Sequence, residues 1–190
     1  MSRPSSAKVI ALIALLAVCL APGRAVADND LRISNLSVFL NDYDVTVQGV
    51  LLGAVPSSLT ESLQSGVPVH VRFVVELRQQ GFRDKLLQTR IVERQLTYNP
   101  ATKEYKVVSL SGEDREPFMS KQLRDAQRVL SEARSVKLMP ASSLDLDDVI
   151  YVRVRAESAL NGENTFVARM AGTAEQTILQ SDFRTIRRIQ

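Results

Sequence analysis

The sequence predicts a mainly β protein, an antiparallel β-sandwich of the immunoglobulin-like type with one longer and one short helix. Three observations support this fold class. Apolar and polar residues alternate with a period of two over several stretches, turn-forming residues separate these stretches, and only two segments have apolar residues at helical spacing. The alternative is an α+β layer, in which helices cover one face of a single curved sheet.

The segment VPVHVRFVVEL (67–77) shows the strand pattern most clearly. Its odd positions from Val67 to Leu77 are all apolar, whereas the even positions include His70 and Arg72. This alternation predicts a long strand with one face on a core and the other in water. The same pattern predicts strands in LRISNLSVFL (31–40), YDVTVQGVLL (43–52) and VIYVRVRAES (149–158).

Residues 67–108 predict an antiparallel meander. The first strand turns near Gly81, and LLQTRIVERQLTY (86–98) runs back along it. The tight turn NPAT (99–102) then leads into KEYKVVSL (103–110), with Asn99 starting the turn and Pro100 presetting the next φ angle. Strands joined by such short turns must be antiparallel, because parallel strands need long crossovers.

Two segments predict helices. The first, 57–66, is short, with Ser57 or Ser58 as its cap and Gly66 at its end. The second, 117–134, is longer, and opposite charges four residues apart lie on its solvent-facing side. We expect its apolar stripe to pack against a sheet, with a partner-helix surface as the alternative. The stripe consists of Met119, Leu123, Ala126, Leu130 and Ala133.

The first 27 residues have the pattern of a cleaved signal peptide. A basic start precedes the apolar run VIALIALLAVCLA (9–21), which is too short for a stable membrane anchor. Pro22 and Gly23 then break the helix, and the sequence Ala-Val-Ala at 25–27 suits a signal peptidase, so we expect cleavage after Ala27. Lipidation at Cys19 is the weaker alternative, because Val18 stands where a lipoprotein box needs a small residue. Residues 28–190 are then a single exported domain.

Cleavage changes the charge and the cysteine count of the chain. It removes three basic residues and no acid from a total of 24 Lys and Arg and 21 Asp and Glu, so the exported domain is neutral. A neutral domain has no general attraction to nucleic acid or anionic lipid. It also lacks cysteine, which excludes disulfides and thiolate metal sites.

The segment 61–108 resembles domain-of-unknown-function family 4390, an uncharacterised family of exported bacterial proteins. The resemblance rests on a helix ending in SGVP (65–68), a long alternating strand, an aromatic-x-Asp tip at 82–84, and the turn YNPATKEY (98–105). DVIYVRVRAES (148–158) and SDFRTI (181–186) extend it toward the C-terminus. Membership would imply a signal peptide, one β-rich domain outside the cytoplasm and no known activity. It would also suggest a signalling or envelope role, because relatives are encoded beside membrane sensor kinases.

The sequence offers few groups for catalysis or metal binding. We expect His70, the single histidine, to be a solvent-facing strand residue rather than a general base. The only candidate metal site is a weak one for calcium, the loop LDLDD (144–148) with Asp145, Asp147 and Asp148. The more ordinary interpretation of this loop is a solvated connection. No catalytic residue and no cofactor are predicted.

Two surface features are candidates for binding a partner. The hairpin tip places Phe82 between charged neighbours, and an exposed aromatic beside Arg is a typical interface anchor. The alternative is that Phe82 folds over the sheet edge. The C-terminal segment DFRTIRRIQ is basic and either contacts an acidic partner or protects a sheet edge. The interaction candidates are therefore Phe82, Arg83, Asp84, Arg184, Arg187 and Arg188.

These observations favour a non-enzymatic periplasmic or secreted domain that binds another protein in an envelope or signalling system, for example a membrane sensor kinase. A carrier that holds a small ligand or lipid between its sheets is the alternative. A hydrolase using carboxylates is the third hypothesis, for which no pair of acids can be named.

Overall fold

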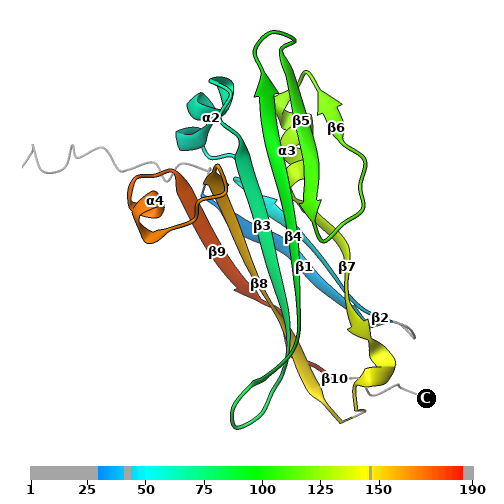
Figure 1. Cartoon of the computed structure of the whole chain (residues 1–190). Coiled ribbons are helices and arrows are strands. Elements are labelled where there is room, and N and C mark those ends of the chain that lie inside the picture. Colours follow the sequence, from blue (N-terminus) through cyan, green and yellow to red (C-terminus); the bar gives the residue numbers. More distant parts are fainter. Residues whose placement is uncertain (1–29, 41–43, 146, 186–190) are drawn as a thin grey trace, which may run out of the picture.

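Two antiparallel β-sheets lie face to face in the computed structural model, which describes residues 30–40, 44–145 and 147–185 (Figure 1). The smaller sheet has the order β1-β2-β7, and the larger one has the order β10-β8-β3-β4-β5-β6, with β9 also paired to β8. The chain is therefore mainly β and forms a β-sandwich, as predicted. The expected signal peptide, residues 1–27, lies outside the described residues.

The strands have the following bounds. The smaller sheet contains β1 (Arg32–Leu40), β2 (Asp44–Leu52) and β7 (Glu132–Pro140). The larger sheet contains β3 (Val69–Gln79), β4 (Lys85–Asn99), β5 (Glu104–Ser111), β6 (Phe118–Ser120), β8 (Val149–Leu160), β9 (Ala174–Gln180) and β10 (Arg184–Thr185).

The alternation of β3 places its apolar side chains on the face toward the smaller sheet. Phe73 lies opposite Val92 of β4 and Ala156 of β8, and all three are buried. From the smaller sheet, β2 contributes Val45 and Val47 to the same core. Burying one such large apolar side chain contributes about 1.5–3 kcal/mol, so this shared layer holds the two sheets together.

Helix α2 (Ser57–Gln64) and helix α3 (Leu123–Ser131) close the sandwich. Leu59 and Leu63 of α2 are fully buried, and so are Ala126 and Leu130 of α3. Helix α3 packs against β4, β5, β6 and β2, so Ala126 and Leu130 of the predicted stripe belong to the core, whereas Met119 lies on β6 and is 65% exposed. The expectation of packing against a sheet is confirmed for this helix.

The predicted turns take the expected form. The carboxamide oxygen of Asn99 accepts hydrogen bonds from the backbone N–H groups of Ala101 and Thr102, at 2.9 and 3.3 Å, which closes the β4–β5 turn. Gly66 has a φ of 93° just after α2, as expected for a glycine that ends a helix.

The predicted helix 117–134 is wrong at both ends. Residues 118–120 pair with β5 instead, and the helix starts only at Leu123. At the other end, the chain leaves the helical conformation at Glu132 because Ala133 pairs with Gly49 of β2. Pairing and burial of alternate residues in β7 outweigh the helical propensity of this segment.

Three short elements in the second half of the chain were not expected. These are β9, helix α4 (Phe166–Met170), which follows β8, and a single 3-10 turn at Ala141–Ser143. Thr165 caps α4 by accepting the N–H of Ala168 at 3.0 Å. Within the described ranges, no helix is both long and apolar enough to cross a membrane.

Candidate functional site

The loop between β3 and β4 exposes an aromatic side chain completely. Phe82 has a relative exposure of 103%, and Gly81, Arg83 and Asp84 are also exposed. Figure 1 shows this hairpin reaching beyond the rest of the sheet at its lower end. The alternative in which Phe82 folds over the sheet edge is therefore excluded.

The carboxylate of Asp84 fixes the shape of this tip. It accepts a hydrogen bond from the Tyr151 hydroxyl at 2.6 Å and one from the Gly81 backbone N–H at 3.4 Å. The Tyr151 hydrogen bond, together with that of Gly81, lowers the pKa of the Asp84 carboxyl below its ordinary 3.8. The same bond raises the pKa of the Tyr151 hydroxyl above 10.0. The hairpin is thus fastened to the neighbouring strand β8.

The C-terminal segment reaches the same corner of the molecule. The rings of Phe183 and Tyr151 meet edge to face, with centroids 5.3 Å apart and planes at 77°. Arg184 follows on β10, paired with Ile150, and its side chain is exposed. The structure therefore brings together two surfaces that the sequence suggested separately. Arg187 and Arg188 lie outside the described residues.

Arg184 also borders an open hollow on the outside of the smaller sheet. The hollow has a volume of about 710 Å³, and Phe39, Thr46, Gln48 and Lys137 line it with Arg184. Phe39 is about half exposed there. This surface adds a third exposed aromatic, besides Phe82 and Phe183, to the end of the molecule that contains β10.

The acidic loop 144–148 does not assemble a metal site in the described residues. The Asp148 carboxylate accepts hydrogen bonds from the side-chain amide of Gln79 and from the backbone N–H of Asp145. Within the part of the chain that the structure describes, no three histidine, cysteine, aspartate or glutamate side chains are grouped so that they could hold a metal ion. The calcium hypothesis for Asp145, Asp147 and Asp148 gains no support.

His70 is less exposed than the strand pattern predicts. Its side chain is only 15% exposed, because Gly162 of the loop after β8 lies close over the ring. Nε2 lies 3.0 Å from the Gln95 amide nitrogen, and Nδ1 lies 3.5 Å from a Glu93 oxygen. The contacts of His70 that the structure gives include no serine, so this geometry matches a structural polar cluster.

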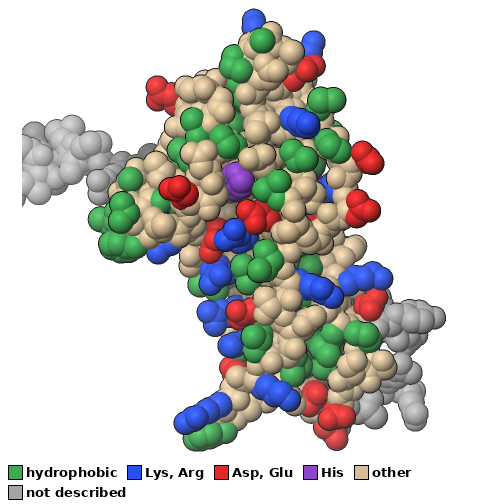
Figure 2. All heavy atoms as spheres, in the orientation of Figure 1, with side chains coloured by type: hydrophobic (Ala, Val, Ile, Leu, Met, Phe, Trp, Pro, Cys, Tyr) green, Lys and Arg blue, Asp and Glu red, His purple; other side chains and the backbone are tan. Residues whose placement is uncertain are grey.

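The outer face of the larger sheet consists of interleaved charges. Arg72 donates to Glu93 at 3.2 Å, and Arg155 lies 3.0 Å from Glu157. Figure 2 shows basic and acidic side chains side by side over this face. The mixed signs give the face no strong field of its own, which is typical of a solvated sheet surface.

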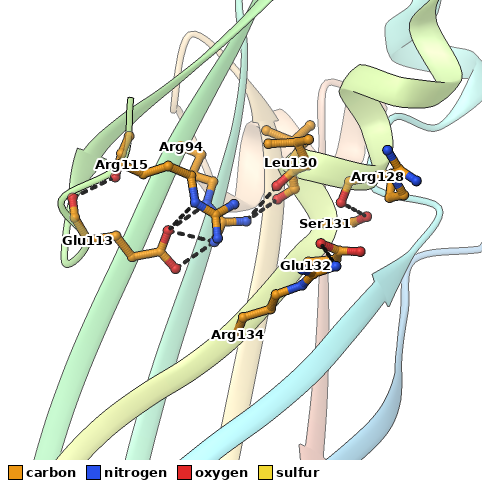
Figure 3. A network of polar contacts seen from close by, with 10 residues as sticks. Arg94, Glu113, Arg115, Arg128, Leu130, Ser131, Glu132 and Arg134 are labelled. Carbon is orange, nitrogen blue, oxygen red and sulfur yellow. Dashed lines mark hydrogen bonds and ion pairs between the residues drawn. The ribbon is translucent and has the colours of Figure 1, made fainter. Parts of the chain in front are cut away.

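The most buried charge of the described residues is Arg94 of β4, whose side chain has no exposed surface (Figure 3). Its Nη2 donates hydrogen bonds to both carboxylate oxygens of Glu113, at 2.6 and 2.7 Å. Nη1 donates to the carbonyl oxygens of Val129 and Leu130, at 2.7 and 3.2 Å. Burial lowers the pKa of the Arg94 guanidinium, and its contact with Glu113 opposes this shift.

Arg94 thereby joins three segments that are far apart in the sequence. Glu113 belongs to the chain leaving β5, and the two carbonyl groups end helix α3 just before β7. A helix leaves its last carbonyls without partners, and a cation near that end is also favoured by the helix dipole. Arg94 therefore stabilises the end of α3 and the junction with β7 by satisfying the last helix carbonyls.

The strand pattern contains a signal for this buried charge. Val92, Leu96 and Tyr98 share the inward-facing positions of β4, and Arg94 occupies the same set. A cation on the inward face requires a buried partner. The identity of that partner does not follow from the sequence.

Comparison with known families gives one result. The family model described as "Domain of unknown function (DUF4390)" matches residues 28–162. No match was found among curated proteins or among solved structures.

Proposed function

The chain belongs to the family DUF4390, a domain of unknown function, and from this premise we propose that it is a non-enzymatic interaction domain. It acts outside the cytoplasm, after removal of residues 1–27, and binds another protein of the cell envelope or of a signalling system. The β3–β4 hairpin tip makes the central contact. Phe82 is the anchor, and Arg83, Phe183 and Arg184 are further contact residues at the same corner of the molecule.

The observation that carries this proposal is the full exposure of Phe82 on a loop that hydrogen bonds of Asp84 hold in place. Leaving a large aromatic side chain in water loses the stabilisation that burial would give. The Asp84 contacts with Tyr151 and Gly81 hold the loop in one shape before any partner arrives, which lowers the entropic cost of binding. Exposed aromatic and arginine side chains are the usual centres of protein interfaces.

The carrier hypothesis has weaker support. The centre of the sandwich is filled by packed side chains, among them Phe73, Leu77 and Leu96, which are at most 1% exposed. Native mass spectrometry of gently purified protein decides this question. A bound small molecule or lipid that survives purification would favour the carrier.

Affinity capture from crosslinked envelope extract tests the proposal. We expect the wild-type domain to recover a specific partner, and Phe82→Ala to lose most of it. Phe166→Ala is the matched control, because Phe166 is also exposed, at 70%, but belongs to α4 at the other end of β3 and β8. Equal recovery by Phe82→Ala and wild type, or a loss caused only by Phe166→Ala, contradicts the proposed site.

A further inference from the structure

An open groove separates the two sheets along one side of the molecule. Its volume is about 630 Å³, within the range of ligand-binding clefts. One wall is the middle of β4, the other is β7, and the loop after β5 closes one end. The lining residues are Thr89, Arg90, Ile91, Gly112, Glu113, Arg134, Ser135, Val136 and Lys137.

The β4 wall of this groove is a free strand edge. Pairing between β4 and β5 stops at Glu93 and Ser111, whereas β4 continues back to Lys85. The chain then passes Gly112, which has a φ of 82° and lies against the Ile91 carbonyl of β4 without continuing the ladder. Among the described strands, only β3 pairs with residues 85–92 of β4.

Alternate backbone groups on this edge face away from β3, and the Ile91 carbonyl faces Gly112. A Cβ added at Gly112 would lie 2.0 Å from the Ile91 carbonyl oxygen, so that carbonyl faces away from β3. In an antiparallel pair, every second residue turns its N–H and C=O away from its partner strand. Thr89, two positions before Ile91, therefore directs both of its backbone groups outward.

The opposite wall is a poorer template for a strand. Pairing between β2 and β7 shifts between Gly49 and Val47, and Ser135 has a left-handed φ of 51°. A bulge of this kind interrupts the regular row of donors and acceptors and protects an edge from pairing. A strand entering the groove would pair with β4 rather than with β7.

The basic side chains that line the groove favour an acidic partner. Arg90, Arg134 and Lys137 are basic, and the one lining acid, Glu113, is held by Arg94. Arg134 pairs with Glu132 at 2.7 Å and Lys137 with Asp44 at 2.9 Å, but both cations are mostly exposed. Exposed pairs of this kind contribute little, so the two cations can turn toward a bound carboxylate.

The two faces of β4 favour different kinds of side chain on an added strand. Arg90 belongs to the face toward the smaller sheet, and Ile91, which is 46% exposed, belongs to the outer face. Residues on an added strand would alternate between these faces. Acidic residues would meet Arg90 and Lys137, and apolar residues would meet Ile91.

We propose that this groove binds an extended acidic segment of a partner protein, which adds to the larger sheet as a strand beside residues 88–91 of β4. Main-chain hydrogen bonds to Thr89 would supply affinity, and the basic lining would supply specificity. This surface is separate from the hairpin tip, so the inference stands or falls independently of the proposed function.

Hydrogen exchange of the free protein, purified from cells that express the full chain, gives the first test. We expect the Thr89 amide to exchange at least a hundredfold faster than the Arg90 amide, whose hydrogen bond is to β3. Equal protection of the two amides would mean that the edge is already occupied and would overturn the proposal.

Titration with a synthetic peptide gives the second test. The probe is an N-acetylated seven-residue peptide of alternating valine and glutamate, followed by the amide resonances of Thr89 and Ile91. We expect binding with slowed exchange at Thr89, no binding when lysine replaces glutamate, and no binding when alternate peptide nitrogens are methylated. Equal binding of either control peptide, failure of the probe, or its binding elsewhere contradicts the proposal.

Protein variants separate the groove from general charge effects. Arg90→Glu should weaken binding of the glutamate peptide at least tenfold. Arg169→Glu is the matched control, because Arg169 is an exposed arginine of α4, outside the groove lining, and this change should leave the affinity within twofold. Equal losses in the two variants would overturn the assignment of the site.

Discussion

At the scale of single residues, Arg94 shows how a charge can occupy a core. Transfer of an unpaired guanidinium out of water would be prohibitive, but Glu113 and two helix-end carbonyls satisfy this one. The number of contacts makes the group sensitive to the loss of any partner. Its role is to fix the junction of α3 and β7.

Replacing Arg94 by methionine should therefore destabilise the protein strongly. The change leaves the Glu113 carboxylate and the carbonyls of Val129 and Leu130 without their donor, and we expect a loss of about 3–5 kcal/mol in the free energy of unfolding. Urea denaturation measures it. Arg72→Met is the control, because Arg72 is 41% exposed in its pair with Glu93 and should lose less than about 1 kcal/mol. Similar losses in both variants would refute the structural role of Arg94.

Gly112 allows a close approach that no other residue allows. Gly112→Ala would place a methyl group 2.0 Å from the Ile91 carbonyl oxygen, in addition to the cost of a positive φ. Gly66→Ala isolates the second effect, because Gly66 has a φ of 93° but no atom within 4 Å of its added Cβ. We expect about 1–2 kcal/mol for Gly66→Ala and clearly more for Gly112→Ala, measured by urea denaturation. Equal losses would show that the collision relaxes without cost.

At the scale of elements, the β3–β4 hairpin combines a fixed frame with an exposed end. Asp84 connects it to Tyr151, and Tyr151 in turn contacts Phe183. The pKa of Asp84 is lowered, so its contribution to the loop is present above the unfolded value near 3.8 and is lost as the pH falls through the lower folded value.

The resonances of the Tyr151 ring should therefore move in an acid titration below pH 3.8 and stay constant between pH 5 and 7. Asp84→Asn should abolish this step and speed exchange of the Gly81 amide at neutral pH. Asp145→Asn, a change at another exposed loop aspartate, is the control and should do neither. A Tyr151 signal that ignores pH in the wild type would contradict the role of Asp84.

The long elements were predictable because their side chains alternate between the core and solvent with one period over many residues. From Val69 to Leu77 every second residue is buried, so period two identifies β3 directly. The prediction of one helix over 117–134 is wrong at its ends. Ala126 and Leu130 do fit a helix, but pairing with β2 ends that helix at Glu132. Short elements such as α4 and β10 contain too few residues to establish a period.

The candidate site was predictable only in part, because its geometry depends on contacts between distant residues. The turn expected near Gly81 placed Phe82, Arg83 and Asp84 at a hairpin tip, with exposure of Phe82 as one of two alternatives. The bond from Asp84 to Tyr151 spans 67 positions in the sequence, and Arg94 reaches Leu130 over 36. No local pattern encodes such pairs. The free edge of β4 likewise appears only once the shorter length of β5 is known.

At the scale of the whole molecule, the sandwich serves as a rigid support with different surfaces at its margins. The charged outer face of the larger sheet mixes both signs, the hairpin tip exposes an aromatic side chain, and the groove between β4 and β7 is basic. The two margins are the places where partner binding is expected, because each leaves groups exposed that a partner would satisfy.

Site-specific photo-crosslinking in living cells tests the interaction role most directly. A photoreactive phenylalanine analogue replaces Phe82 at the β3–β4 tip, and the same analogue replaces Lys103 at the β4–β5 turn as a control. We predict a discrete crosslinked protein from position 82 and none from position 103. No adduct at position 82, or the same adducts at both positions, would contradict the account.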